Sequence, residues 1–144
     1  MDKIKFCDLN HLLVEKVKDL GIESVQNDYF NESVDTERAV LITASNPHFS
    51  FGGGIDAKFA EYFPYYCRMK QLKGGGNERI GNICFCVTVD KTFKATKEIV
   101  KEAIQFALDN TYEGETLLLS GVGTGIGGLD IETFVSILKE IKRN

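Results

Sequence analysis

Short apolar runs alternate along the chain with longer segments in which apolar residues recur at helical spacing. The clearest helical segment is 95–110, where apolar residues from Val100 to Leu108 follow the i, i+3, i+4, i+7, i+8 spacing of one helix face. The predicted strands are residues 3–7, 22–26, 38–43, 82–89 and 116–120. The predicted helices are residues 10–21, 55–63, 95–110 and 129–144, with a polar loop at 27–37 and a turn region at 72–81. This alternation predicts one α/β domain over residues 1–144, with a mixed, largely parallel sheet between two helical layers.

Composition narrows the class of protein. The chain has 144 residues, of which 43% are apolar and 26% charged, as in an ordinary globular domain with a buried core. The net charge of −4 argues against a general nucleic-acid binder, and no sequence-specific nucleic-acid binding is expected. No apolar run approaches the ~20 residues needed to cross a membrane, and residues 1–10 lack the apolar core of a signal peptide. A cytoplasmic location without a membrane partner is therefore expected.

The four cysteines lie mostly in apolar, strand-like segments, as free cysteines do in a reducing cytosol. Cys84 and Cys86 are two positions apart and would share one face of a strand. A zinc site would need further ligands, and the chain offers only two histidines. No metal site and no cofactor are expected.

Two predicted strands each run directly into a glycine-rich loop that precedes a helix. The strand 38–43 leads to "SNPHFSFGGGID" at 45–56, and the strand 116–120 leads to "GVGTGIGG" at 121–128. Such loops expose backbone N–H groups with no Cβ in the way, and a helix N-terminus adds about half a unit of positive charge. Because ligands of parallel sheets bind beyond the carboxyl ends of strands, the two loops predict a site for two linked phosphates.

The second loop has other interpretations. Its glycines at 123, 125 and 128 have the spacing of the dinucleotide fingerprint, which also needs a further strand and an acidic residue about 20 positions on. Only 16 residues follow Gly128. No Gly-Lys-Ser/Thr follows either loop, so a P-loop is excluded. Two tight strand-to-helix turns without a ligand remain the alternative, although glycine loses more conformational freedom on folding than any other residue.

Four elements in order resemble the macro domains, which bind ADP-ribose. "ESVQNDYF" is similar to that family's strand and glycine–aspartate pair, with Asn27-Asp28 in place of Gly-Asp. "LITASN", "FGGGIDAKF" and "SGVGTGIGGLD" are similar to its asparagine-bearing strand end, its glycine run with helix, and its second phosphate loop. The resemblance covers about residues 22–140, and residues 1–21 resemble an extra strand–helix unit found ahead of some bacterial and phage members. It implies a macro-domain-like fold and, as partner, ADP-ribose or an ADP-ribosylated macromolecule.

The resemblance also implies roles for individual residues. Asp28 would accept a hydrogen bond from the adenine amino group, and Asn46 would bind the distal ribose hydroxyls. Each has a plainer alternative, because both residue types commonly close turns, and Asp56 in a first helical turn can simply complement the helix dipole. Ligand contacts are implied at Asp28, Tyr29, Gly52, Gly53, Gly54, Ile55, Asp56, Gly121, Gly123, Thr124, Gly125, Ile126 and Gly127.

"GIGGLD" and "AKFAEYFP" are most similar to the branch of terminal ADP-ribose–protein glycohydrolases and DNA ADP-ribosyl glycohydrolase antitoxins. That branch is implied to use the aspartate after the glycine pair, here Asp130, and a lysine directly after the threonine that ends the fourth strand. Val89 follows Thr88, and Lys91 is the nearest lysine. The catalytic candidates are therefore Asn46, Asp130 and Lys91, with Asp130 alternatively the N-cap of the last helix through the Thr133 N–H.

Three further loop residues have two interpretations each. Phe49 and Phe51 either flank a ribose or adenine face or lie buried beneath the loop. His48 either transfers a proton or is solvated. The resemblance favours hydrolysis of an ADP-ribosyl linkage or a related ADP-ribose ester. The missing lysine favours a non-catalytic module that binds ADP-ribose or a related NAD-derived nucleotide, and a structural domain that binds a protein partner is a third possibility.

Overall fold

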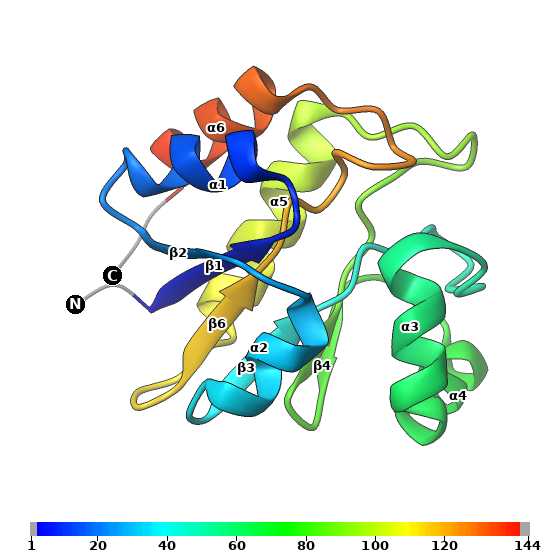
Figure 1. The fold of residues 1–144 in the computed structure, drawn as a ribbon. Coiled ribbons are helices and arrows are strands. Elements are labelled where there is room, and N and C mark those ends of the chain that lie inside the picture. The colour runs from blue at the N-terminus through cyan, green and yellow to red at the C-terminus, as the bar shows by residue number, and fades with distance from the viewer. Residues whose placement is uncertain (1–2, 142–144) are drawn as a thin grey trace.

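Strands and helices alternate along the chain, and helices cover both faces of one sheet (Figure 1). The computed structural model describes residues 3–141. Within that range the strands are β1 Ile4–Asp8, β2 Glu23–Gln26, β3 Ala39–Ile42, β4 Glu78–Ile80, β5 Ile83–Phe85 and β6 Thr116–Leu119. The helices are α1 His11–Lys18, α2 Tyr29–Asp35, α3 Gly54–Tyr62, α4 Pro64–Lys73, α5 Lys97–Asp109 and α6 Ile131–Glu140. The predicted α/β class is confirmed.

The six strands form a single mixed sheet in the order β2-β1-β6-β3-β5-β4. All neighbouring pairs are parallel except β4 and β5, which are antiparallel. Strand β1 lies between β2 and β6, so residues 4–8 are part of the interior of the sheet and not an appendage to it. No helix in residues 3–141 is long and apolar enough to cross a membrane.

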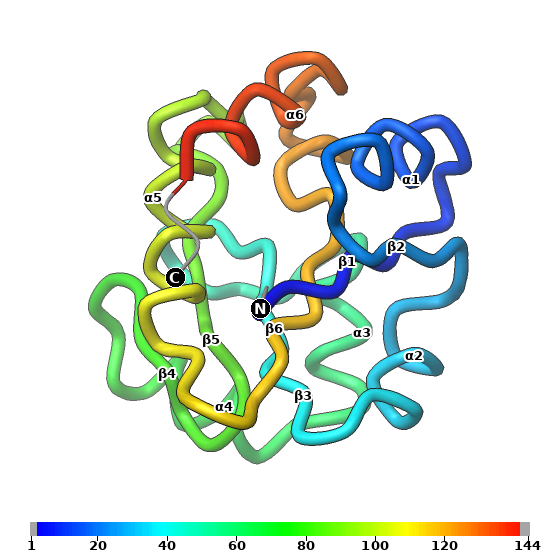
Figure 2. Tube along the Cα trace, turned by 90° about the vertical axis from the view of Figure 1, so that its left-hand side faces the viewer, coloured from blue at the N-terminus to red at the C-terminus, as the bar shows by residue number. Residues whose placement is uncertain are grey.

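Successive strand residues contribute to opposite faces of the sheet, as the pleat requires. Leu117 and Leu119 of β6 belong to one buried cluster, whereas Leu118 belongs to the other. Helices α1, α5 and α6 supply the first cluster, and α2, α3 and α4 supply the second. Figure 1 and Figure 2 show these two sets of helices on opposite faces, an arrangement compatible with a three-layer α/β/α fold.

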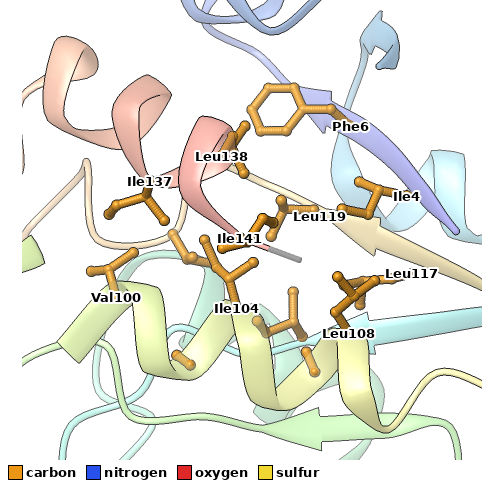
Figure 3. Close-up of a cluster of buried hydrophobic side chains, with 14 of the residues drawn as sticks. Ile4, Phe6, Val100, Ile104, Leu108, Leu117, Leu119, Ile137, Leu138 and Ile141 are labelled. Atoms are coloured by element: carbon orange, nitrogen blue, oxygen red, sulfur yellow. The ribbon is translucent and has the colours of Figure 1, made fainter. Parts of the chain in front are cut away.

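The amphipathic helices that the sequence predicts contribute many of the side chains of the first cluster. Ile104 of α5 and Ile137 of α6 are fully buried in the same cluster as Leu119 of β6 (Figure 3). Each apolar side chain buried in this way contributes about 1.5–3 kcal/mol relative to full exposure. This cluster supports the strand ends at which the second glycine loop begins.

Residues 27–37 are not the loop that their polar composition predicts, because they contain helix α2. Asp28 caps it by accepting hydrogen bonds from the N–H groups of Phe30 and Asn31, both at 3.0 Å. Only Tyr29 and Glu32 of this helix are buried. Glu32 is paired with Lys5 at 2.5 Å, which lowers the pKa of the carboxyl group. A helix with one buried apolar residue leaves no apolar period in the sequence.

Helix α3 ends at Tyr62, before Pro64, as predicted, but a second helix that was not predicted, α4, begins at Pro64. The glycine turn that follows α4 is also more ordered than a solvent loop. The Lys70 ammonium is buried and donates to the carbonyls of Gly74 and Gly76 and to Glu78 of β4. The region 72–81 thus contains a strand as well as the predicted turn.

Candidate functional site

A cavity of about 430 Å³ lies at the carboxyl ends of the parallel strands. Its walls come from the residues that follow β1, β2, β3, β5 and β6, together with the first turns of α2 and α3. This volume falls within the usual range for a small-molecule site. The carboxyl-end position is the one that the α/β architecture predicts for a ligand.

The second glycine loop forms one wall, from Gly121 to Gly127. Three of its glycines are required by close packing. A Cβ at Gly121 would lie 2.5 Å from Leu13, at Gly123 2.7 Å from Val100, and at Gly127 2.8 Å from Ala95. Gly125 differs, since a Cβ there would meet nothing within 4 Å. Packing therefore does not account for the glycine at 125.

Several N–H groups of this loop are available to a ligand. Gly121 N–H donates to the Asp8 carboxylate at 2.9 Å, and Thr124 N–H donates to the Gly121 carbonyl at 3.0 Å. The N–H groups of Gly125, Ile126 and Gly127 have no hydrogen-bond acceptor within residues 3–141. Three adjacent free donors beside a cavity form an anion-binding arrangement.

The first glycine loop contributes the N-terminus of α3. Gly53 is the N-cap and supplies no side-chain hydrogen bond, so the N–H groups of the first helical turn are left open. Gly54 has φ +58°, a conformation that glycine adopts at no steric cost, and both Gly54 and Ile55 line the cavity. Gly52 and Gly53 do not line it. Of the predicted glycine run, only its last member contacts the cavity.

The two glycine loops meet through one side chain. A Cβ on Gly53 would lie 3.3 Å from Ile126 Cδ1, and one on Gly54 would lie 3.7 Å from it. Ile126 lines the cavity and is 73% exposed. The bare backbone at 53 and 54 therefore accommodates Ile126 of the opposite loop as well as exposing the N–H groups of α3.

Asp28 and Tyr29 both line the cavity but have different side-chain environments. The Oδ1 atom of Asp28 caps α2, and its Oδ2 atom has no partner in the described part of the chain. The Tyr29 hydroxyl is buried, donates to the Leu118 carbonyl at 2.5 Å and accepts from Ile42 N–H at 3.0 Å. Burial raises the pKa of Tyr29 well above its ordinary value. Its hydroxyl joins β3 to β6 and is not available to a ligand.

Asn46 is not at the cavity, because its side chain closes the turn that follows it. Its Oδ1 accepts from His48 N–H at 2.9 Å, and its Nδ2 donates to Ser50 Oγ at 2.6 Å. His48 is exposed and likewise does not line the cavity. The turn-closing alternative describes Asn46 in this structure.

Phe49 and Phe51 are buried beneath the loop, which decides between their two interpretations. Their φ angles are +52° and +53°, a strained conformation for large side chains. Helix α4 holds this turn in place, since Gln71 donates to the Phe49 carbonyl at 3.1 Å and the Lys70 ammonium lies 4.8 Å from the ring centroid of Phe49. The strain is thus located in the segment that leads to the open N-terminus of α3.

Asp56 is buried and lies outside the cavity. Its carboxylate accepts from Ala44 N–H at 3.1 Å and also interacts with the Ser45 side chain, whose hydroxyl donates to Thr43 Oγ1 at 2.8 Å. Burial raises the pKa of Asp56 to about 6. Asp56 therefore connects the first turn of α3 to the segment that follows β3.

Asp130 and Lys91 do not line the cavity either. Asp130 is exposed and is the N-cap of α6, accepting from Thr133 N–H at 2.7 Å, as one of its two interpretations predicts. This hydrogen bond lowers the pKa of Asp130. Lys91 is exposed in a tight turn closed by Asp90, which accepts from the N–H groups of Thr92 and Lys94. None of the three catalytic candidates contacts the cavity.

Thr88 and Val89 line the cavity at the place where the resemblance implies a lysine. Val89 is buried. The Thr88 Oγ1 is the one buried side-chain nitrogen or oxygen atom within residues 3–141 that has no hydrogen-bond partner. An unsatisfied buried hydroxyl costs about 1–3 kcal/mol, and at the edge of a cavity it indicates a polar occupant.

Sequence reasoning missed several residues that line the cavity. Asp8 and Leu9 end β1, and they could have been identified from the rule that strand ends form the site. Phe30 belongs to the helix that was predicted as a loop. Lys58 lies four residues after Gly54, where helical periodicity places it on the same face.

No metal centre is found in the described range. No group of three or more histidine, cysteine, aspartate or glutamate side chains within residues 3–141 is placed to hold a metal ion. The four cysteines are free and buried, and burial raises the pKa values of Cys7 and Cys84 to about 12. These thiols are poor nucleophiles and pack as apolar groups.

Neither protein-family models nor the curated proteins include a match to this chain. Function must therefore be inferred from the residues of the cavity.

Proposed function

We propose that this protein binds ADP-ribose in the cavity at the carboxyl ends of its parallel strands, with a macro-domain-like fold. The observation that carries the proposal is the pairing of two sets of free backbone donors across one cavity. The first set is the uncapped N-terminus of α3, and the second is the run from Gly125 to Gly127. A diphosphate offers two adjacent anionic groups, which such donors bind.

The adenine is assigned to the α2 end of the cavity. Asp28 combines an occupied Oδ1 with an Oδ2 that has no protein partner in residues 3–141, and the exocyclic amine of adenine is a matching donor. Phe30 and Leu9 line the same end and offer apolar surface for a base. The distal ribose is assigned to the opposite end, where the unpaired Thr88 hydroxyl would gain a partner.

Binding without turnover is the function that these residues support best. Asn46, Asp130 and Lys91 lie outside the cavity, and Val89 occupies the position of the implied lysine. Hydrolysis of an ADP-ribosyl linkage stays a prediction from the resemblance alone. Incubation with ADP-ribosylated protein and DNA decides it, because released ADP-ribose would require a catalytic group at the cavity that these three residues do not supply.

Isothermal titration calorimetry with ADP-ribose, its hypoxanthine analogue and AMP tests the proposal. We expect saturable binding of ADP-ribose and at least about tenfold weaker binding of the analogue, because losing a charge-assisted hydrogen bond costs about 1.5–3 kcal/mol. Asp28→Ser is the matched variant, since serine keeps an N-cap oxygen for α2 while removing the carboxylate. It should bind the two ligands with similar affinity. Absence of ADP-ribose binding to the wild-type protein would contradict the proposal.

A further inference from the structure

The charged side chains that line the cavity differ in how far hydrogen bonds within the protein occupy them. Within residues 3–141 those that line it are Asp8, Asp28 and Lys58. Both carboxylate oxygens of Asp8 are occupied, since Oδ1 accepts from Asn10 N–H and Oδ2 from Gly121 N–H, each at 2.9 Å. Lys58 is the one basic side chain among the described residues that line the cavity.

The position of Lys58 on α3 brings it to the open helix N-terminus. Residues four apart lie one above the other on a helix, and every Cα–Cβ bond tilts toward the N-terminal end. Lys58 is four residues after Gly54, and glycine has no side chain to stand between the lysine and the first turn. Lys58, Gly54 and Ile55 thus line the same cavity, and the Lys58 ammonium is paired with Glu61, three residues further along α3.

Fold stability does not account for a lysine at this position. Lys58 is the fifth residue of α3, beyond the first turn in which the helix dipole acts on a charged side chain. The ion pair of Lys58 with Glu61 is 3.4 Å long and its two side chains are each 59% exposed, so it contributes little. Because this lysine contributes little to the fold and lines the cavity, its charge can serve a ligand there.

We propose that Lys58 is the cationic phosphate ligand of this cavity. This proposal rests on the proposed function, because the ligand that Lys58 would bind is the diphosphate of ADP-ribose. The α3 N–H groups hydrogen-bond the phosphate oxygens, and Lys58 exchanges its exposed partner Glu61 for the diphosphate and neutralises part of its charge. The ligand class is therefore an anionic diphosphate ester, and its binding depends on ionic strength.

The test compares Lys58→Met with two controls by calorimetry. Lys58→Met keeps the length of the side chain and removes its charge, and we expect about tenfold weaker binding of ADP-ribose and of inorganic pyrophosphate. Its affinity should also depend less on salt between about 50 and about 500 mM NaCl. Lys97→Met, which removes an exposed lysine paired with Glu140 away from the cavity, should bind as the wild type does. Glu61→Gln should bind equally well or better.

The outcomes separate this inference from the proposed function. If the wild-type protein binds ADP-ribose and Lys58→Met binds it with the same affinity and salt dependence, the role of Lys58 is overturned and the proposed function stands. If the wild type binds pyrophosphate but not ADP-ribose, and Lys58→Met weakens that binding, Lys58 keeps its role and the proposed function fails. If the wild type binds neither ligand, both are overturned. The melting temperature of each unliganded variant verifies folding.

Discussion

The two glycine loops look alike in the sequence, but they lead into helices with different N-termini. Helix α3 begins at Gly53 without a side-chain cap, and its first turn lines the cavity. Helix α6 begins at Asp130, whose carboxylate accepts from Thr133 N–H at 2.7 Å, and its first turn does not line the cavity. The N-cap residue, and not the glycine content, distinguishes the helix whose donors are open from the helix whose donors are satisfied.

This difference assigns separate roles to the two loops. The first loop delivers a helix N-terminus to the cavity, whereas the second loop contributes its own backbone from Gly125 to Gly127. A strand–glycine–helix pattern therefore predicts the position of the cavity better than it predicts which atoms line it. Five substitutions would break or sharpen the comparison.

The largest effect is expected from Gly123→Val. Gly123 has φ +86°, and a Cβ there would lie 2.7 Å from Val100 Cγ2, so the strain and the overlap together should destabilise the fold by roughly 3–5 kcal/mol. Gly125→Val, which meets nothing within 4 Å, should change stability by less than about 1 kcal/mol. Urea unfolding of both variants measures this. Equal destabilisation would show that the second loop is not packed as described.

The next largest effect is expected from Asp56→Asn, on stability. Asp56 is in the first turn of α3, but its side chain is buried and does not cap the helix. Its pKa is about 6, above the 3.8 of an unfolded aspartate, so the folded state holds the proton more tightly. Its contribution to stability is therefore fully present below about pH 4 and is lost as the pH rises to about 6. Asp56→Asn should remove this dependence and be more stable than wild type at pH 8 by up to about 3 kcal/mol.

The measurement is urea unfolding of wild type and Asp56→Asn at pH 4 and pH 8. The two proteins should have similar free energies of unfolding at the lower pH. A variant less stable than wild type at pH 8 would show instead that the ionised carboxylate is needed to hold Ala44 N–H and the Ser45 side chain.

Gly53→Asp would convert the open N-terminus of α3 into one capped like that of α6. Gly53 has φ −162°, which any residue adopts, and the nearest atom to a new Cβ is the flexible end of Ile126 at 3.3 Å. The carboxylate would satisfy first-turn N–H groups and repel phosphate, so ADP-ribose affinity should fall at least about tenfold. Calorimetry measures the affinity, and an unchanged value would remove the α3 N-terminus from the site.

Asp130→Ala is the reciprocal change and should have the smallest effect on binding. Loss of the N-cap hydrogen bond should lower the melting temperature, while ADP-ribose affinity stays within about twofold because α6 does not line the cavity. A large loss of affinity, or loss of a hydrolytic activity in a protein that has one, would restore Asp130 to the site.

Much of the fold could be predicted because its signal is local. The apolar period of α5 and the buried runs of β3 and β6 appear directly in the sequence. Helix α2 could not be predicted, because its buried residues are Tyr29 and Glu32, and the buried Glu32 is paired with Lys5. A salt bridge between residues so far apart in sequence leaves no periodic pattern.

The location of the cavity could be predicted from the sequence, but not all of the residues that line it. The glycines at 54 and 121–127 line the cavity as predicted, because strand ends and glycine loops are positional signals. Asn46 and Asp130 do not line the cavity, and their position could not be predicted because a residue that caps a turn or helix has the same sequence signal as one that binds a ligand. Lys58 could not be identified from the sequence, because its position at the cavity depends on how α3 packs against the strand ends.

The most direct test of the account is an amide ¹H–¹⁵N NMR titration of the wild-type protein with ADP-ribose. Hydrogen bonds to phosphate should shift the amide resonances of Gly54, Ile55 and Gly125 to Gly127, because these N–H groups are free and lie at the cavity. The amides at the start of α6, from Ile131 to Thr133, should not move. Shifts concentrated at α6 instead of α3, or no shifts at saturating ADP-ribose, would contradict it.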